Sequence, residues 1–155
     1  MPNALIKKYK TTLKAEGWTE DVEQLSAVNS LQRLSSELKS KDGFRLWPFG
    51  KKGDDIKGVY LYGGVGRGKS MLMDLFFEQA PENILKRRIH FHEFMIETHD
   101  WLHKKRGDRV DDLMPRYAEH VSKKVGLLCF DEFHVTDVAD AMLLGRLFIA
   151  LFERG

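Results

Sequence analysis

The residues best suited to chemistry form a glycine-rich run near the middle of the chain. Gly63-Gly64-Val65-Gly66-Arg67-Gly68-Lys69-Ser70 matches the pattern G-x-x-x-x-G-K-[ST] without a gap. The glycines let the backbone curl until successive N–H groups face phosphate oxygens, and a helix that begins at Lys69 directs its positive end at the same anion. The Lys69 ammonium can reach the β and γ phosphates, and the Ser70 hydroxyl is a hard oxygen ligand that suits Mg²⁺. The run therefore predicts a site for a nucleoside triphosphate.

An acidic pair supplies the second part of the predicted site. Asp131 and Glu132 directly follow the apolar run 126–130, and parallel sheets bind ligands at the carboxyl ends of their strands. We expect Asp131 to hold Mg²⁺ through water, and Glu132 to polarise the water that attacks the γ-phosphate. The second acid favours hydrolysis over binding alone. Arg67 either contacts phosphate or faces solvent, and the sequence leaves both open.

Other candidate sites are weaker. His99 and His103 lie one helical turn apart, but the residues between them do not make the H-E-x-x-H pattern and no third ligand stands out. Cys129 is the single cysteine, so no disulfide forms within the chain, and its place in an apolar run is typical of a small buried residue. A dinucleotide fingerprint is excluded because Lys69 stands where the third glycine would be.

Composition limits the class of protein. The 25 basic and 23 acidic residues give a net charge of +2, which provides no argument for binding nucleic acid or an anionic membrane, while 43% apolar residues are enough for a core. The N-terminus lacks the features of a signal peptide. No apolar run approaches the roughly 20 residues of a membrane helix. We therefore expect a cytoplasmic protein with no transmembrane segment.

Two regions of different pattern must position these residues. Region 1–55 is expected to hold a helix from Ala4, a second helix capped within Thr19-Glu20-Asp21 and running to about Leu38, and a loop over 40–55. Region 56–155 alternates strands with helices, which predicts a mainly parallel sheet in an α/β layer fold. The expected strands are 58–62, 88–92 and 126–130. The expected helices are 69–80, 94–105, 115–124 (with Pro115 in its first turn) and 138–153.

Several blocks together resemble one known family. The stretch from Tyr60 to Phe76 around the glycine-rich run is similar to the phosphate loop of the ZapE cell-division ATPases and the related mitochondrial "ATPase family gene one" proteins. Three further blocks agree: Arg88–Met95, Leu128–Phe133 and Val135–Leu144. Asp21-Val22-Glu23-Gln24 is similar to the family's D-x-x-Q. The resemblance covers the chain from about residue 20 to its end.

The resemblance implies an AAA+-type P-loop ATPase that uses ATP and Mg²⁺ to remodel a protein partner. Within it, Lys69 and Glu132 would be catalytic, residues Gly63 to Met71 would contact the nucleotide, and Ser70 and Asp131 would hold the metal. The partner would be a division-ring protein or an inner-membrane protein. The protein would form a homo-oligomer, be cytoplasmic or peripheral at the inner membrane, and not bind nucleic acid directly.

The family pattern continues beyond Gly155 with a sensor strand, an arginine finger and a helical lid, so the resemblance implies a truncated core. The sensor strand would lie between the phosphate-loop strand and the Asp131 strand. We therefore expect 155 residues alone to bind nucleotide weakly and hydrolyse it poorly. Three alternatives stay open: a nucleotide-gated binding module of the helicase-loader type with little hydrolysis, a small-molecule kinase, and a scaffold with an inactive site.

Overall fold

The computed structural model describes residues 3–42, 56–64, 66, 68–105 and 107–154. These residues form two compact units, 1–83 and 84–155, and each is described by itself. The predicted loop 40–55 falls almost wholly outside the described residues. No helix within the described ranges is long and apolar enough to cross a membrane.

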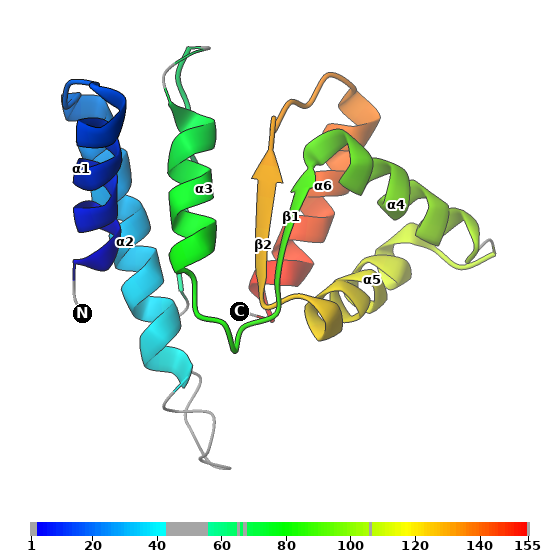
Figure 1. Ribbon diagram of the computed structural model, residues 1–155. Helices are drawn as coiled ribbons and strands as arrows, with labels where there is room; N and C mark the ends of the chain where they lie inside the picture. Colours follow the sequence, from blue (N-terminus) through cyan, green and yellow to red (C-terminus); the bar gives the residue numbers. More distant parts are fainter. Residues whose placement is uncertain (1–2, 43–55, 65, 67, 106, 155) are drawn as a thin grey trace. The chain divides into compact units, whose positions relative to one another are not determined.

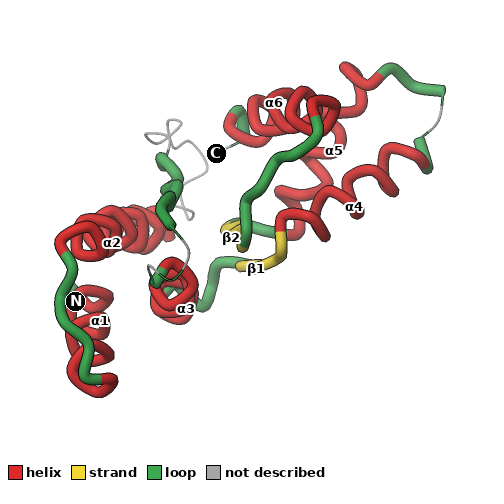
Figure 2. Tube along the Cα trace, turned by 90° about the horizontal axis from the view of Figure 1, so that it is seen from above, coloured by secondary structure: helices red, strands yellow, loops and turns green. Residues whose placement is uncertain are grey.

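The first unit is a group of three helices, α1 (Ala4–Glu16), α2 (Val22–Asp42) and α3 (Lys69–Gln79) (Figures 1 and 2). An apolar stripe on each helix faces the other two, as the helical spacing predicts. An ion pair between Lys8 and Glu78 joins α1 to α3 at the surface. The buried apolar residues are Leu5, Tyr9 and Leu13 of α1, Val28, Leu31, Leu34 and Leu38 of α2, and Leu72, Leu75 and Phe76 of α3.

Local signals set the ends of these helices. Gly17 adopts a left-handed conformation with φ of 69° and ends α1. The Asp21 carboxylate accepts hydrogen bonds from the N–H groups of Glu23 (2.7 Å) and Gln24 (3.1 Å), so it caps α2 as predicted. Ala80 is extended, as a residue before a proline tends to be, and α3 ends before it.

Residues 58–62, predicted as a strand, form no regular secondary structure. The side chains of Tyr60 and Tyr62 are exposed and stack on each other with ring centroids 6.3 Å apart. A strand is completed by hydrogen bonds to a neighbouring strand, and in the described residues the sheet has two strands, neither of which is this segment. The pattern of residues 58–62 is typical of a strand, but among the described residues this segment has no strand to pair with.

The second unit contains the sheet, a parallel pair formed by β1 (Lys86–His90) and β2 (Leu127–Asp131). Figure 1 shows the two arrows side by side, and Arg88 pairs with Cys129 and His90 with Asp131. The predicted parallel pairing is confirmed. The larger parallel sheet expected from the sequence is not formed by the described residues.

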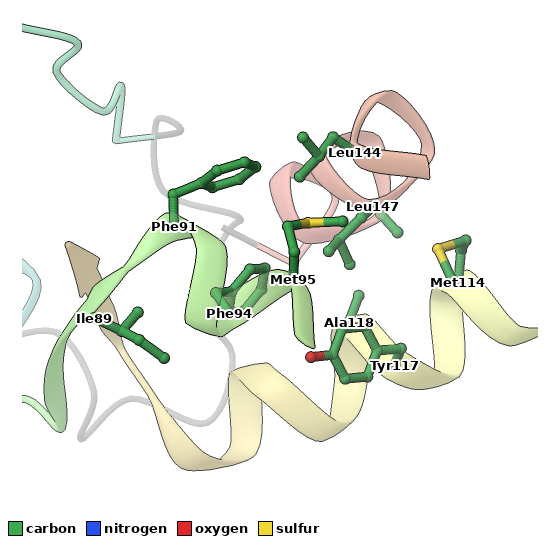
Figure 3. Close-up of a cluster of buried hydrophobic side chains, with 10 residues drawn as sticks. Ile89, Phe91, Phe94, Met95, Met114, Tyr117, Ala118, Leu144 and Leu147 are labelled. Carbon is green, nitrogen blue, oxygen red and sulfur yellow. The ribbon is translucent and has the colours of Figure 1, made fainter. Parts of the chain in front are cut away.

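Three helices, α4 (Phe91–His103), α5 (Val110–Lys124) and α6 (Val138–Phe152), build the core of the second unit. The Asp137 carboxylate accepts from the N–H of Ala139 and caps α6. Figure 3 shows side chains from β1, α4, α5 and α6 converging on one cluster. Its buried members are Ile89, Phe91, Phe94, Met95, Met114, Tyr117, Ala118, Leu144, Leu147 and Ala150.

Two predicted boundaries in this unit are wrong. The strand predicted over 88–92 ends at His90, because Phe91 begins α4 and turns into the core, where it packs against Phe130 and Phe133. The helix predicted from Pro115 begins five residues earlier, at Val110, so Pro115 lies beyond the first turn.

Candidate functional site

The described residues of the glycine-rich run, 63–64, 66 and 68, lead directly into α3. Gly63, Gly66 and Gly68 have φ of 146°, 79° and 76°, values that side chains other than glycine's rarely adopt. The first hydrogen bond of the helix joins the N–H of Leu72 to the carbonyl of Gly68. The N–H groups of the turn before it have no carbonyl partner within the helix, which suits them to an anion.

The Lys69 side chain folds back over this loop. Its ammonium donates to the carbonyl oxygens of Gly63 (2.6 Å) and Gly64 (3.1 Å). Lys69 thus joins the start of the run to the first residue of the helix, and its positive charge lies over the loop. Ser70, the next residue, is exposed.

A second layer of residues from α1 and α2 supports the loop. A methyl group built on Gly68 would lie 2.9 Å from Gln24 Nε2 and 3.5 Å from Met71 Cε. Gln24 therefore lies directly against the loop. The buried Tyr9 hydroxyl donates to Gln24 Oε1 at 3.0 Å, and burial raises the pKa of Tyr9 above its ordinary value.

The Asp131 carboxylate is engaged by an arginine from the neighbouring strand. Arg88 Nε donates to Asp131 Oδ2 (2.5 Å) and Arg88 Nη2 to Asp131 Oδ1 (3.0 Å). The two side chains are 25% and 20% exposed, so the pair is mostly withdrawn from water. Such a two-point ion pair, called a fork below, uses one lone pair on each carboxylate oxygen and leaves a second lone pair on each.

Glu132 differs from Asp131 in its exposure to solvent, in its partner and in its backbone conformation. Its side chain is 84% exposed, and His90 Nδ1 lies 3.8 Å from Glu132 Oε2. Its φ of 51° makes it the one described residue other than glycine with a positive φ. A left-handed backbone at an ordinary residue costs roughly 1 kcal/mol. Backbone strain of this kind is concentrated at functional sites.

Arg87 and Cys129 anchor β1 and β2, the strands that carry Arg88 and Asp131. Arg87, on the other face of β1 from Arg88, donates to both oxygens of Glu97 on α4 at 2.8 and 2.6 Å. This hydrogen bond lowers the pKa of Glu97 and raises that of Arg87. Burial raises the pKa of the Cys129 thiol to about 11, so Cys129 is a protonated core residue at neutral pH, as the sequence indicates.

The predicted site residues fall into both units. Gly63 to Met71 are contiguous in the first unit, although Val65 and Arg67 lie outside the described residues, while Asp131 and Glu132 lie in the second. His99 Nε2 lies 2.7 Å from Asp140 Oδ1. No group of three or more His, Cys, Asp or Glu that could hold a metal occurs in the part of the chain that the structure describes.

Each unit holds a donor of the kind that Mg²⁺ accepts. The Ser70 hydroxyl in the first unit and the Asp131 carboxylate in the second are both hard oxygens, and Mg²⁺ keeps several waters when it binds such ligands. Because Arg88 leaves a lone pair on each Asp131 oxygen, that carboxylate can still accept hydrogen bonds from metal-bound water.

Sequence reasoning missed three residues of these sites. Arg88 and His90 alternate along β1 and pair with Cys129 and Asp131 of β2. They therefore share the face of the sheet that holds Asp131, and that polar alternation was a usable signal. Gln24 belongs to a quoted motif, but nothing in the sequence connected it with a loop more than forty residues away.

The chain as a whole is similar to known proteins. The model of the AFG1-like ATPase family matches residues 4–155. An uncharacterized protein of Schizosaccharomyces pombe is 36% identical over 99% of this chain and 41% of its own length. Cell division protein ZapE of Escherichia coli K12 is 45% identical over 78% of this chain and 32% of its own.

A third relative, lactation elevated protein 1 homolog B of Danio rerio, is 42% identical over 64% of this chain and 21% of its own length. No solved structure is significantly similar. The chain thus spans well under half the length of these relatives. With a family match over almost all of its residues, the chain belongs to the AFG1-like ATPase family.

Proposed function

We propose that this chain is the nucleotide-binding part of an Mg²⁺-dependent ATPase. The observation that carries the proposal is the loop from Gly63 to Lys69, whose left-handed glycines lead into the N-terminus of α3 and whose lysine lies over it. A turn with this backbone and charge suits a polyphosphate better than it suits any neutral ligand.

Each residue has a role in this proposal. Gly63 to Met71, including Val65 and Arg67, surround the phosphates with N–H groups and positive charge. Lys69 neutralises charge that develops on the β and γ phosphates, and Ser70 and Asp131 hold Mg²⁺, which supplies Lewis-acid stabilisation when it is bound. Glu132 orients the attacking water and accepts its proton. The exposed, strained position of Glu132 suits a group that must meet a water molecule.

The biological setting is proposed by relation to the family. ATP hydrolysis would drive remodelling of a protein partner, a division-ring protein or an inner-membrane protein, by a homo-oligomer that is cytoplasmic or peripheral at the inner membrane. The name of the Escherichia coli relative supports a role in cell division. We further propose that residues 1–55 are a helical segment before an AAA+-type core in residues 56–155, which a longer chain completes.

The decisive experiment is Mg²⁺-dependent ATP hydrolysis by the full-length protein and by residues 1–155, measured in parallel. Glu132→Gln and Lys69→Ala serve as the test variants. We expect turnover in the full-length protein, little in residues 1–155, retained ATP binding without turnover in Glu132→Gln, and no detectable binding in Lys69→Ala.

The outcomes separate the remaining readings. Binding without turnover in both proteins would replace the ATPase by a nucleotide-gated module of the helicase-loader type. Unchanged binding in Lys69→Ala would refute the phosphate role of the loop. Full activity of residues 1–155 as a monomer would contradict the expectation that further sequence completes the core.

A further inference from the structure

The second unit contains a small cavity that the function proposed above does not use. It lies between α4, α5 and the two strands, and its volume is about 90 Å³. Its inner wall includes Phe94 and Tyr117, which belong to the buried cluster in Figure 3. The Tyr117 hydroxyl is already used within the core. Because the Thr98 hydroxyl donates its only proton to the carbonyl of Phe94, Tyr117 donates to Thr98 Oγ1 at 3.0 Å.

One part of the cavity wall is aromatic and apolar. Trp101 of α4 packs on Tyr117 and His120 of α5, with ring centroids 5.0 and 5.9 Å apart. These rings hold one another in place, and three aliphatic side chains continue the wall beside them. Such a surface suits the methylene groups of a side chain, which gain from leaving water. The aliphatic residues are Val121, Val125 and Leu128.

The other part of the wall is charged. Arg87 donates to both carboxylate oxygens of Glu97, so these two charges offset each other. The pKa of Glu97 is lowered chiefly by this hydrogen bond and to a smaller extent by the charge of Lys124. Within the part of the chain that the structure describes, the Lys124 ammonium has no hydrogen-bond or ion-pair partner. With two cationic side chains against one carboxylate, the cavity has an excess of positive charge.

The size of the cavity limits what can enter it. Its charged side is accessible, because the Arg87 and Glu97 side chains are 41% and 42% exposed and Lys124 is exposed. Pockets that enclose a whole small ligand have roughly 300–1,000 Å³, and a cavity of about 150 Å³ accommodates benzene. A space of about 90 Å³ therefore suits a single side chain that belongs to a larger molecule.

We propose that this cavity binds a glutamate side chain of a protein partner. The carboxylate would accept from the Lys124 ammonium and from N–H groups of Arg87 that the pair with Glu97 leaves unused. The methylene groups of the glutamate would cover the aromatic wall. Arg87 and Lys124 repel a cationic side chain, and a phosphate would place strongly hydrated oxygens against apolar groups.

The proposal is independent of the nucleotide site. The cavity lies wholly in the second unit, whereas the phosphate loop lies in the first. It gives the second unit a docking point for an acidic segment of another polypeptide, and binding there requires neither ATP nor Mg²⁺.

The test is a saturation-transfer NMR titration of the full-length protein with defined probes. Acetyl-glutamate methylamide represents the side chain within a polypeptide, and the glutamine and lysine analogues vary its charge. Acetate represents a free carboxylate, and inorganic phosphate represents the other common anion.

Three variants accompany the wild type, and thermal unfolding confirms that each is folded. Lys124→Met removes the excess charge. Lys123→Met is the matched control, because it removes the same charge from the same helical turn, but Lys123 pairs with Glu119 at 2.7 Å and does not line the cavity. Val121→Phe fills the cavity without a change of charge.

The wild type should bind the glutamate probe about tenfold more tightly than the glutamine probe, because charge-assisted hydrogen bonds are stronger. It should bind acetate about fivefold more weakly than the glutamate probe, since acetate lacks the methylene groups. Lys124→Met should lose about tenfold in affinity for the glutamate probe, Lys123→Met should match the wild type, and Val121→Phe should bind neither amino-acid probe. If Val121→Phe does not fold, Lys124→Met decides the question, because Lys124 is exposed.

Three results would overturn the inference. Equal affinity of the wild type for the glutamate and glutamine probes would remove the charge from recognition. Equal losses in Lys124→Met and Lys123→Met would show attraction to the positive charge of the whole unit and not to this cavity. Acetate, phosphate or the lysine probe binding as tightly as the glutamate probe would assign the cavity to another ligand. Failure of the proposed ATPase is distinct, because it is measured with ATP and Lys69→Ala and leaves these affinities unchanged.

Discussion

Arg88 on β1 and Asp131 on β2 form a two-point ion pair across parallel strands, with Nε to Oδ2 at 2.5 Å and Nη2 to Oδ1 at 3.0 Å. The pair joins β1, which holds the start of the block Arg88–Met95, to the acid that we propose as a metal ligand. The register of the two strands brings these side chains together. Arg88 is opposite Cys129, and Asp131 follows Cys129 by two residues on the same face of the sheet.

The ion pair should stabilise the second unit measurably. Because both side chains are about three-quarters or more withdrawn from water, we expect Arg88→Met and Asp131→Asn each to lower the free energy of unfolding by about 1–3 kcal/mol. A double-mutant cycle followed by urea denaturation should give a coupling energy of at least about 1 kcal/mol. Arg33→Met, which breaks the exposed pair with Glu37, is the control and should show little coupling. A coupling near zero for Arg88 would mean that water replaces the fork without loss.

The same pair should set the Mg²⁺ requirement of the proposed site. A guanidinium next to Asp131 repels a divalent cation that binds at this carboxylate. Arg88→Met should therefore lower the Mg²⁺ concentration for half-maximal ATP binding by about tenfold, roughly a 1.4 kcal/mol effect. Arg88→Lys, which keeps the charge but not the fork, should stay close to the wild type. A higher Mg²⁺ requirement in Arg88→Met would indicate instead that Arg88 holds the carboxylate in its binding orientation.

Features set by neighbours in sequence could be predicted. The phosphate loop is a local pattern, and its glycines adopt the left-handed backbone that the pattern requires. The cap at Asp21 and the end of α3 before Pro81 follow equally local rules. The parallel pairing of β1 with β2 followed from the alternation of strands with helices.

Features set by distant partners could not be predicted. Residues 58–62 have the composition of a strand, but a strand exists only with a partner, and none of the described segments pairs with it. The local sequence predicts a strand at Phe91. Its contacts with Phe130 and Phe133, which are distant in the sequence, accompany its place in the helix α4 instead. The contact of Gln24 with Gly68 likewise depends on how two helices pack, which no local pattern specifies.

Position 68 should tolerate only glycine. Alanine there would carry a φ of 76° and meet Gln24 Nε2 at 2.9 Å, so we expect Gly68→Ala to lower the free energy of unfolding by about 1–2 kcal/mol. Gly145 on α6 is the matched control, because its added methyl meets nothing within 4 Å and alanine is favoured in a helix by up to about 1 kcal/mol. Chemical denaturation of both variants checks this. Equal stability of Gly68→Ala and wild type would show that the loop rearranges freely.

The buried thiol should make stability fall at high pH. Burial raises the pKa of Cys129 to about 11, from 9.0 for an exposed thiol, so the unfolded chain loses this proton at lower pH than the folded chain. The contribution is fully present below pH 9 and is lost as pH rises toward 11, because deprotonation then favours the unfolded state. By linkage it amounts to about 1.4 kcal/mol lost at pH 10.

Cys129→Ala isolates this effect from the tyrosines, whose ionisation also contributes at high pH. The free energy of unfolding, measured from pH 7 to 10.5, should fall less steeply with pH in the variant than in the wild type. Alanine also lowers this free energy by a roughly constant amount at every pH, because packing is lost. In the wild type, a thiol reagent at pH 8 should react at the rate of unfolding. Parallel pH curves for the two proteins, or rapid labelling of the native protein, would show that water reaches Cys129 and that its proton is not held by burial.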